Sequence, residues 1–146
     1  MTSHMTILSA LKEKFETLKN NSGKALFTSV TIETRPVTPE SMFDLHPDMT
    51  EFPTAVLVPG ETLPANGGLT ATLTLDLFLI TEDCHSDGTS GRHLRLLENI
   101  LEILSPDSAG KAPSAGGAHL LAVNAKTEMF GDAYPGWRIR LKACHE

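Results

Sequence analysis

The order of the periodic segments constrains the fold of this chain more than any single motif does. Apolar residues recur at helical spacing from Ile7 to Leu18, alternate in three strand-like segments, return to helical spacing from about Arg92 to Leu104, and alternate again in two closing segments. This order, α-β-β-β-α-β-β, predicts an α+β domain in which helices pack on a single mixed or antiparallel sheet. The chain of 146 residues is long enough for one such domain.

The segment from Thr70 to Ile80 alternates most regularly. One face consists of Ala71 followed by leucines at every second position, whereas the other begins with threonines and Asp76 and becomes apolar at Phe78 and Ile80. A face that changes from polar to apolar is typical of a strand that lies partly beneath another element or a partner subunit. We expect the leucine face to pack against the second helix.

The remaining segments predict shorter strands, turns and two contrasting loops. Prolines flank a short strand, Ala55 to Val58, which suits strand ends or an edge position. Residues 61–68 read as a connection that ends in a hairpin turn, Asn66-Gly67-Gly68. The loop from Arg35 to Phe52 is rich in apolar residues, so we expect it to pack on its own domain or on a neighbour. The Gly- and Ser-rich stretch from Asp107 to Ala118 predicts a mobile loop.

Composition narrows the classes of function. The chain has 12 basic and 18 acidic residues, a net charge of −6, which argues against direct nucleic-acid binding. No apolar run reaches the length of a membrane-spanning helix, and the N-terminus lacks the pattern of a signal peptide. Both observations favour a cytosolic protein with reduced thiols. Ser3-His4-Met5 resembles a cloning scar, so we interpret residues 1–4 as a remnant and residues 5–146 as the domain.

No catalytic signature stands out. Cys84-His85 and Cys144-His145 offer two pairs of zinc-binding side chains, but adjacent residues of a strand face opposite sides and the usual ligand spacing is missing. Cys84 precedes the second helix, where a thiolate is favoured, although a plain loop cysteine is the simpler interpretation. We therefore assign no catalytic, metal-binding or cofactor-binding residue and predict that the chain is not an enzyme.

Self-association is the better-supported prediction. Arg138, Arg140 and Lys142 form a basic stripe on the last strand, which is either solvated or faces the acidic surface of a neighbouring copy. The apolar loop and the apolar end of the third strand supply further candidate contacts. The predicted interface consists of Met42, Phe43, Leu45, Phe78, Ile80, Arg138 and Arg140.

The order of elements resembles that of the bacteriophage tail terminator and minor tail proteins, the lambda U-like group, and of related prophage tail-completion proteins. The likeness extends over nearly the whole chain. The segments that carry it are Ile7-Leu8-Ser9-Ala10-Leu11, the stretch from Phe52 to Pro59, Leu73-Thr74-Leu75-Asp76-Leu77, the Leu-rich second helix, and Trp137-Arg138-Ile139-Arg140-Leu141.

This resemblance implies a structural protein that forms a ring, usually a hexamer, on the head-proximal end of the tail tube. Such a ring stops tube polymerisation and offers a surface to the head–tail connector, so the implied partners are further copies of the chain, the tail-tube protein and the connector. It also implies assembly in the bacterial cytoplasm, a final place in the virion tail, and no cofactor. The alternatives are a small dimeric ligand-binding or regulatory α+β domain, and a small cysteine- or metal-dependent enzyme.

Overall fold

The computed structural model describes residues 4–19, 23–35, 37–45, 51–65, 70–81, 92–106, 108–109, 113–131 and 134–145. The helices and strands follow one another along the chain in an order close to the expected one, with two short additions, α2 and β4. The elements are α1 (His4–Glu16), β1 (Ser29–Ile32), α2 (Met42–Leu45), β2 (Thr54–Ala65), β3 (Thr70–Ile80), α3 (Arg92–Ile103), β4 (Ser114–Ala115), β5 (Ala118–Phe130) and β6 (Tyr134–His145).

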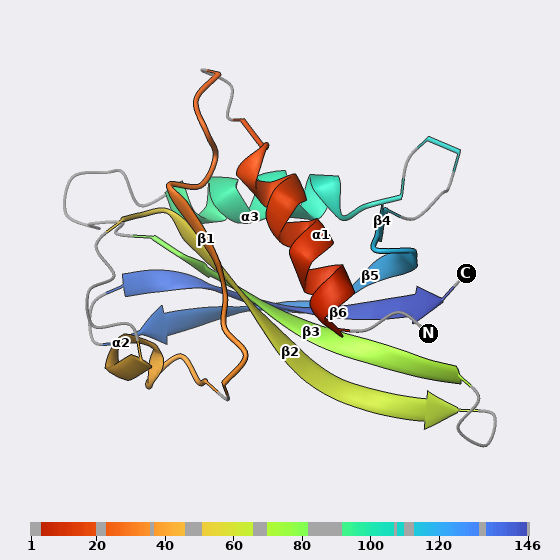
Figure 1. Ribbon diagram of the computed structural model, residues 1–146. Helices are drawn as coiled ribbons and strands as arrows, with labels where there is room; N and C mark the ends of the chain where they lie inside the picture. The colour runs from red at the N-terminus through yellow and green to blue at the C-terminus, as the bar shows by residue number, and fades with distance from the viewer. Residues whose placement is uncertain are drawn as a thin grey trace.

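The strands form one mixed sheet in the order β1-β2-β3-β6-β5-β4 (Figure 1). Only β1 and β2 run parallel; the other neighbours are antiparallel. The hairpins β2–β3 and β5–β6 are joined through the β3–β6 pair, in which Asp76 stands opposite Arg140 and Phe78 opposite Arg138. This topology agrees with the predicted α+β class and with a mixed sheet.

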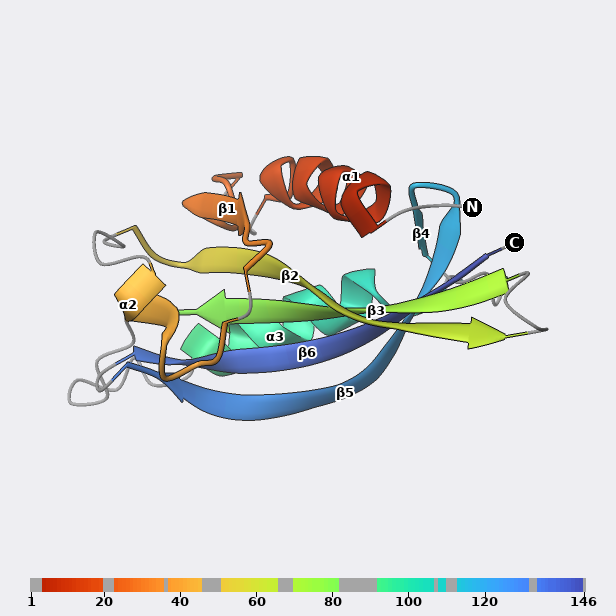
Figure 2. The same cartoon turned by 60° about the horizontal axis from the view of Figure 1, so that its bottom comes forward.

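The main core lies between the sheet and the two longer helices, which lie over one face (Figures 1 and 2). The leucine face of β3 is buried there, as predicted, because alternate residues of a strand point to the same side. On α3 the buried residues are Leu96 and Ile100, and Leu104, which directly follows the helix, is buried as well, whereas Leu94 is exposed. The helical spacing predicts an apolar stripe of Leu94, Leu97, Leu101 and Leu104 that Leu96, Ile100 and Ile103 widen. The centre of this stripe was wrong, because the helix is turned so that Leu96 and Ile100 are buried and Leu94 is not. On α1 the buried residues are Ile7, Leu8, Leu11 and Phe15.

The opposite face of the sheet carries a smaller apolar core at one end. Phe78, Ile80 and Phe130 are buried there beneath the segment that contains α2, and Met42 is buried against them. Reciprocal hydrogen bonds between Thr38 and Ser41 close the turn that begins α2. The expectation that the 35–52 segment packs on its own domain is confirmed for this part. Residues 46–50 and the side chains of Phe43 and Leu45 lie outside the described part of the chain.

Strand β2 is longer than the sequence predicts. It continues through Pro59 to Ala65, with an irregularity between Pro59 and Thr62. Thr74 Oγ1 holds this bulge, because it accepts a hydrogen bond from the Glu61 amide at 2.6 Å and donates one to the Glu61 carbonyl at 3.2 Å. The prolines were expected at strand ends or at an edge position, and both occur. Pro53 precedes the first residue of β2, and Pro59 lies beyond the stretch that β1 covers, which is Thr54 to Leu57.

The mobile loop predicted for residues 107–118 is in part ordered. Ser114 and Ala115 form β4, which turns at Gly116 and Gly117 into β5, and Ala115 and Ala118 are buried. Both glycines have positive φ angles, and a Cβ on Gly116 would lie 3.1 Å from the Thr6 carbonyl oxygen. Small residues therefore serve here for close approach to α1 rather than for flexibility. Residues 107 and 110–112 lie outside the described ranges.

Candidate functional site

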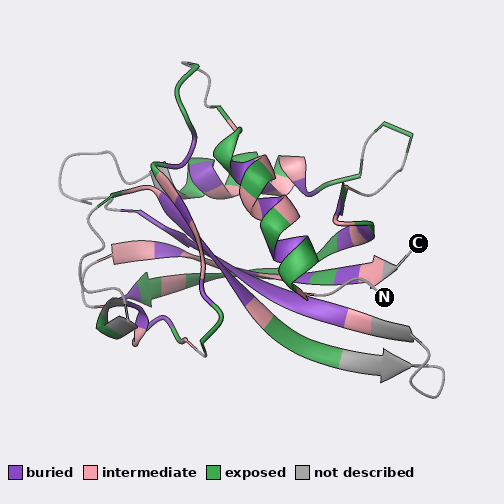
Figure 3. Cartoon of the chain, in the orientation of Figure 1, coloured by how far each residue is buried: buried purple, intermediate pink, exposed green. Residues whose placement is uncertain are grey.

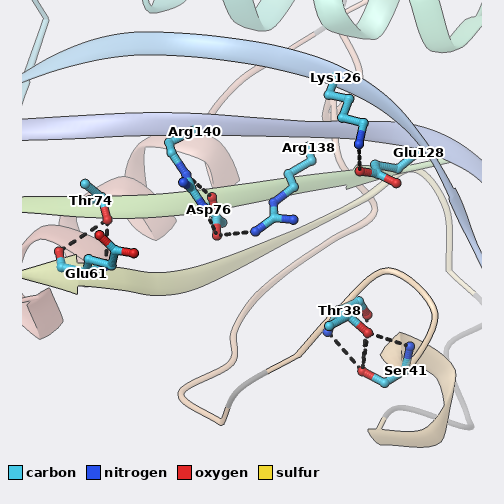
Figure 4. A network of polar contacts seen from close by, with 9 residues as sticks. All are labelled: Thr38, Ser41, Glu61, Thr74, Asp76, Lys126, Glu128, Arg138 and Arg140. Carbon is cyan, nitrogen blue, oxygen red and sulfur yellow. Dashed lines mark hydrogen bonds and ion pairs between the residues drawn. The ribbon is translucent and has the colours of Figure 1, made fainter.

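The polar half of the open sheet face is the first candidate site. The apolar core around Phe78 covers one half of this face, and the other half presents charged side chains from β3, β5 and β6 (Figure 4). We call the side chains of Asp76, Asn124, Lys126, Arg138 and Arg140 the polar cluster. Asn124, Lys126, Arg138 and Arg140 line an open hollow on the surface.

Asp76 holds the polar cluster together. Its carboxylate accepts a hydrogen bond from Arg138 Nη2 at 3.1 Å and another from Arg140 Nε at 3.1 Å. The Asp76 residue is only 7 % exposed. The two arginines on β6 flank it because residues two apart on a strand share a face. A buried carboxylate therefore has charged partners on both sides, as the cost of burying a charge requires.

The electrostatics of the cluster favour the charged form of Arg140. The pKa of Arg140 is raised, first by its hydrogen bond to Asp76 and then by attraction to the same carboxylate. One carboxylate faces two guanidinium groups, so this trio carries an excess positive charge. On the neighbouring strand β5, Lys126 forms an ion pair with Glu128 at 3.7 Å, and the Lys126 side chain is largely exposed. The Arg138 guanidinium also lies 5.6 Å from the centre of the Phe78 ring, at the border with the apolar half.

The structure corrects the predicted interface. Met42, Phe78 and Ile80 are fully buried within their own chain, so they anchor the α2 segment to the sheet and present no surface to a neighbour. The side chains of Phe43 and Leu45 lie outside the described part. Arg138 and Arg140 do lie on the open face, but their direct acidic partner is Asp76 of the same chain. The sequence signal for this pairing was the lone charge in the strand from Thr70 to Ile80.

A second candidate surface lies along β5 (Figure 3). On one side β5 pairs with β6 from Ala118 to Phe130, and on the other side β4 pairs only with Ala118 and His119 of β5. We therefore call residues 121–129 the β5 edge. Eight of these nine residues are exposed. Leu121, Val123 and Met129 are 46 %, 54 % and 53 % exposed, which is high for large apolar side chains in a sheet. Sequence reasoning missed this surface, because alternation alone does not tell an outer strand from an inner one.

The cysteine and histidine pairs give no site in the described part of the chain. Cys144 lies on β6 opposite His119 and carries a free, half-buried thiol. It belongs to a strand that extends to His145. Cys84 and His85 fall outside the described residues. Among those described, no group of three or more potential metal ligands occurs.

No described helix has the length and apolarity that a membrane span requires. Comparison of the chain with models of known protein families gives no match, and no curated protein matches it.

Proposed function

We propose that this chain is a structural protein of a phage or prophage tail, which assembles into a ring that caps the tail tube. The order of its elements and its single mixed sheet support the proposal, because they agree with the resemblance to tail terminator and minor tail proteins. In this role the ring ends tube polymerisation and offers a surface to the head–tail connector. The chain works through its surfaces and needs no cofactor.

The polar cluster is the observation that carries this proposal. A ring requires a contact between two different surfaces that repeats around an axis. The trio of Asp76, Arg138 and Arg140 places excess positive charge on an open sheet face of a chain whose net charge is −6. Such a face is complementary to the acidic remainder of a neighbouring copy. Asp76 keeps the two guanidinium groups in fixed positions for that contact.

Charge reversal at Arg138 tests this proposal. Arg138 is the better choice because it makes one hydrogen bond to Asp76, whereas Arg140 makes two. Purified protein is mixed with tail tubes and the capped tubes are counted by electron microscopy. We expect wild-type protein to give tubes of fixed length with a ring at one end, and Arg138→Glu to lower the number of rings at least tenfold.

Arg95→Glu is the matched control, since it makes the same charge change at an exposed position of α3, on the opposite face of the sheet. It should cap tubes as wild type does. If Arg138→Glu capped as many tubes as wild type, the polar cluster would not be part of the ring contact. Wild-type protein that never binds tubes would overturn the tail function and favour the dimeric α+β alternative.

A further inference from the structure

The backbone of the β5 edge is open to another strand. On its inner side β5 pairs with β6 from Ala118 to Phe130, and on its outer side the described part of the chain supplies a strand only at Ala118 and His119. From Leu121 to Met129, the outward N–H and C=O groups therefore form a row that no strand of the described part of the chain covers. Such a row is a ready template for one more strand.

Both faces of the β5 edge leave room for that strand. Helix α3 packs mainly on β3 and β6, and on the helix side of β5 the residues Ala122, Ala125 and Thr127 are exposed. On the other side Asn124 and Lys126 are exposed as well. An added strand would bury Met129 and its neighbours, whose exposure to water is otherwise unfavourable.

The charges of β5 identify the added strand as a second copy of β5. In an antiparallel pair related by a two-fold axis at Thr127, Lys126 lies opposite the partner's Glu128, and Glu128 opposite the partner's Lys126. Ala125 lies opposite the partner's Met129, and Thr127 opposite the partner's Thr127. Opposite charges and apolar side chains thus face each other across the pair, which stabilises it.

Other registers are less favourable. An axis at Lys126 would place this lysine opposite itself, and like charges in that position are destabilising. An axis at Ala125 would extend the pairing across the bulge between Ala122 and Asn124, where the strand is irregular. The axis at Thr127 keeps the pairing within the regular stretch from Asn124 to Phe130.

We propose that two copies of this chain associate through their β5 edges, antiparallel about Thr127, so that the two six-stranded sheets become one continuous sheet. The pair goes beyond the ring and does not rest on it, because a two-fold contact closes after two copies whereas a ring contact repeats. It covers the edge through which the free chain would otherwise aggregate.

Mixing two charge variants tests the pair. Lys126→Glu makes both facing positions acidic and Glu128→Lys makes both basic, so each variant alone should dimerise about tenfold more weakly than wild type in sedimentation equilibrium. In an equimolar mixture the opposite charges face each other again, and dimers that contain one copy of each variant should form as readily as the wild-type dimer. The pairing of Lys126 with Glu128 within one chain cannot produce this rescue. Circular dichroism of each variant verifies that it is folded.

Cysteine crosslinking tests the register. In a background of Cys84→Ser and Cys144→Ser, Thr127→Cys places two thiols opposite each other on the proposed axis, whereas Ala125→Cys does so only in the shifted register. Both positions are exposed. Mild oxidation should crosslink Thr127→Cys at least tenfold faster than Ala125→Cys.

Two results would overturn the pair: no association in the mixture of charge variants, or crosslinking of Ala125→Cys as fast as that of Thr127→Cys. Both experiments are done without tail tubes. Loss of the pair therefore leaves the capping experiment to decide the ring, and failure of capping leaves the pair standing.

Discussion

Asp76 on β3 and Arg140 on β6 stand directly opposite each other, and the Asp76 carboxylate accepts the hydrogen bond of Arg140 Nε at 3.1 Å. This contact joins the two central strands of the sheet on the face that the longer helices do not cover. Arg138, two residues before Arg140 on β6, donates a hydrogen bond to the same carboxylate. One acidic side chain therefore fixes the positions of two basic ones.

Removal of the Asp76 charge should destabilise the fold. Asp76→Asn leaves two neighbouring guanidinium groups without their carboxylate, and it should lower the free energy of unfolding by about 1–3 kcal/mol in urea titrations. Glu98→Gln makes the same chemical change at an exposed position of α3 and should shift the midpoint little. Equal shifts in the two variants would mean that the ion pairs add nothing to stability.

The pH dependence of this effect follows from Arg140. Its pKa is raised in the folded protein by the hydrogen bond to Asp76 and then by the charge of that carboxylate. A raised pKa contributes stability that is complete below the unfolded-state pKa and is lost only as the pH rises through the folded-state value. Both values lie far above neutrality, so the stability difference between wild type and Asp76→Asn should be the same at about pH 7 and about pH 10. A difference that shrinks over this range would contradict the assignment.

Truncation of the central strand should cost more than truncation of the outer one. Leu77 is fully buried between the sheet and the helices, so Leu77→Ala should lower the free energy of unfolding by about 2–5 kcal/mol. Leu121→Ala makes the same change on the exposed β5 edge and should cost less than about 0.5 kcal/mol at protein concentrations where the chain is monomeric. Denaturant titrations measure the loss of unfolding free energy in both variants. Equal losses would contradict the burial of the leucine face of β3.

Gly136 should not accept a side chain. A Cβ at this position of β6 would overlap the Leu79 carbonyl oxygen and would lie 2.8 Å from Phe130 Cε2. Gly136→Ala must therefore push β6 away from β3, and we expect a loss of about 1–3 kcal/mol in thermal unfolding. Lys142→Ala on the exposed part of the same strand serves as the control. An unchanged melting temperature for Gly136→Ala would show that the strands separate there without cost.

The spacing of apolar residues in the sequence predicted helices and strands well where one side of the element is buried. The strand from Thr70 to Ile80 has the expected bounds, because strict alternation reflects a sheet with one leucine-lined face. The long second half of β2 was missed, since Pro59 and Pro64 signal a break in the sequence. The structure tolerates them because β1 pairs only with Thr54 to Leu57, so that no described strand needs an N–H donor from the prolines on that side.

The candidate surfaces could be predicted only in part, because they depend on which strands become neighbours. Arg138 and Arg140 were recognised as a basic stripe, but their partner Asp76 lies on a strand far away in the sequence. The same limit applies to the β5 edge: its residues read as an ordinary strand, and their exposure follows from the place of β5 near the end of the sheet. Burial of Phe78 and Ile80 likewise follows from the α2 segment, not from a neighbouring subunit.

The position of β6 has a consequence for how the chain folds during synthesis. This strand comes last among those described, yet it lies in the middle of the sheet, between β3 and β5. The ribosome therefore releases β3 and β5 before the strand that separates them, and until β6 arrives each of them has an edge of backbone N–H and C=O groups without its final neighbour. Pairings between sequence-distant strands form slowly. The native sheet therefore cannot be completed before β6 is made, because β3 and β5 come together only through it.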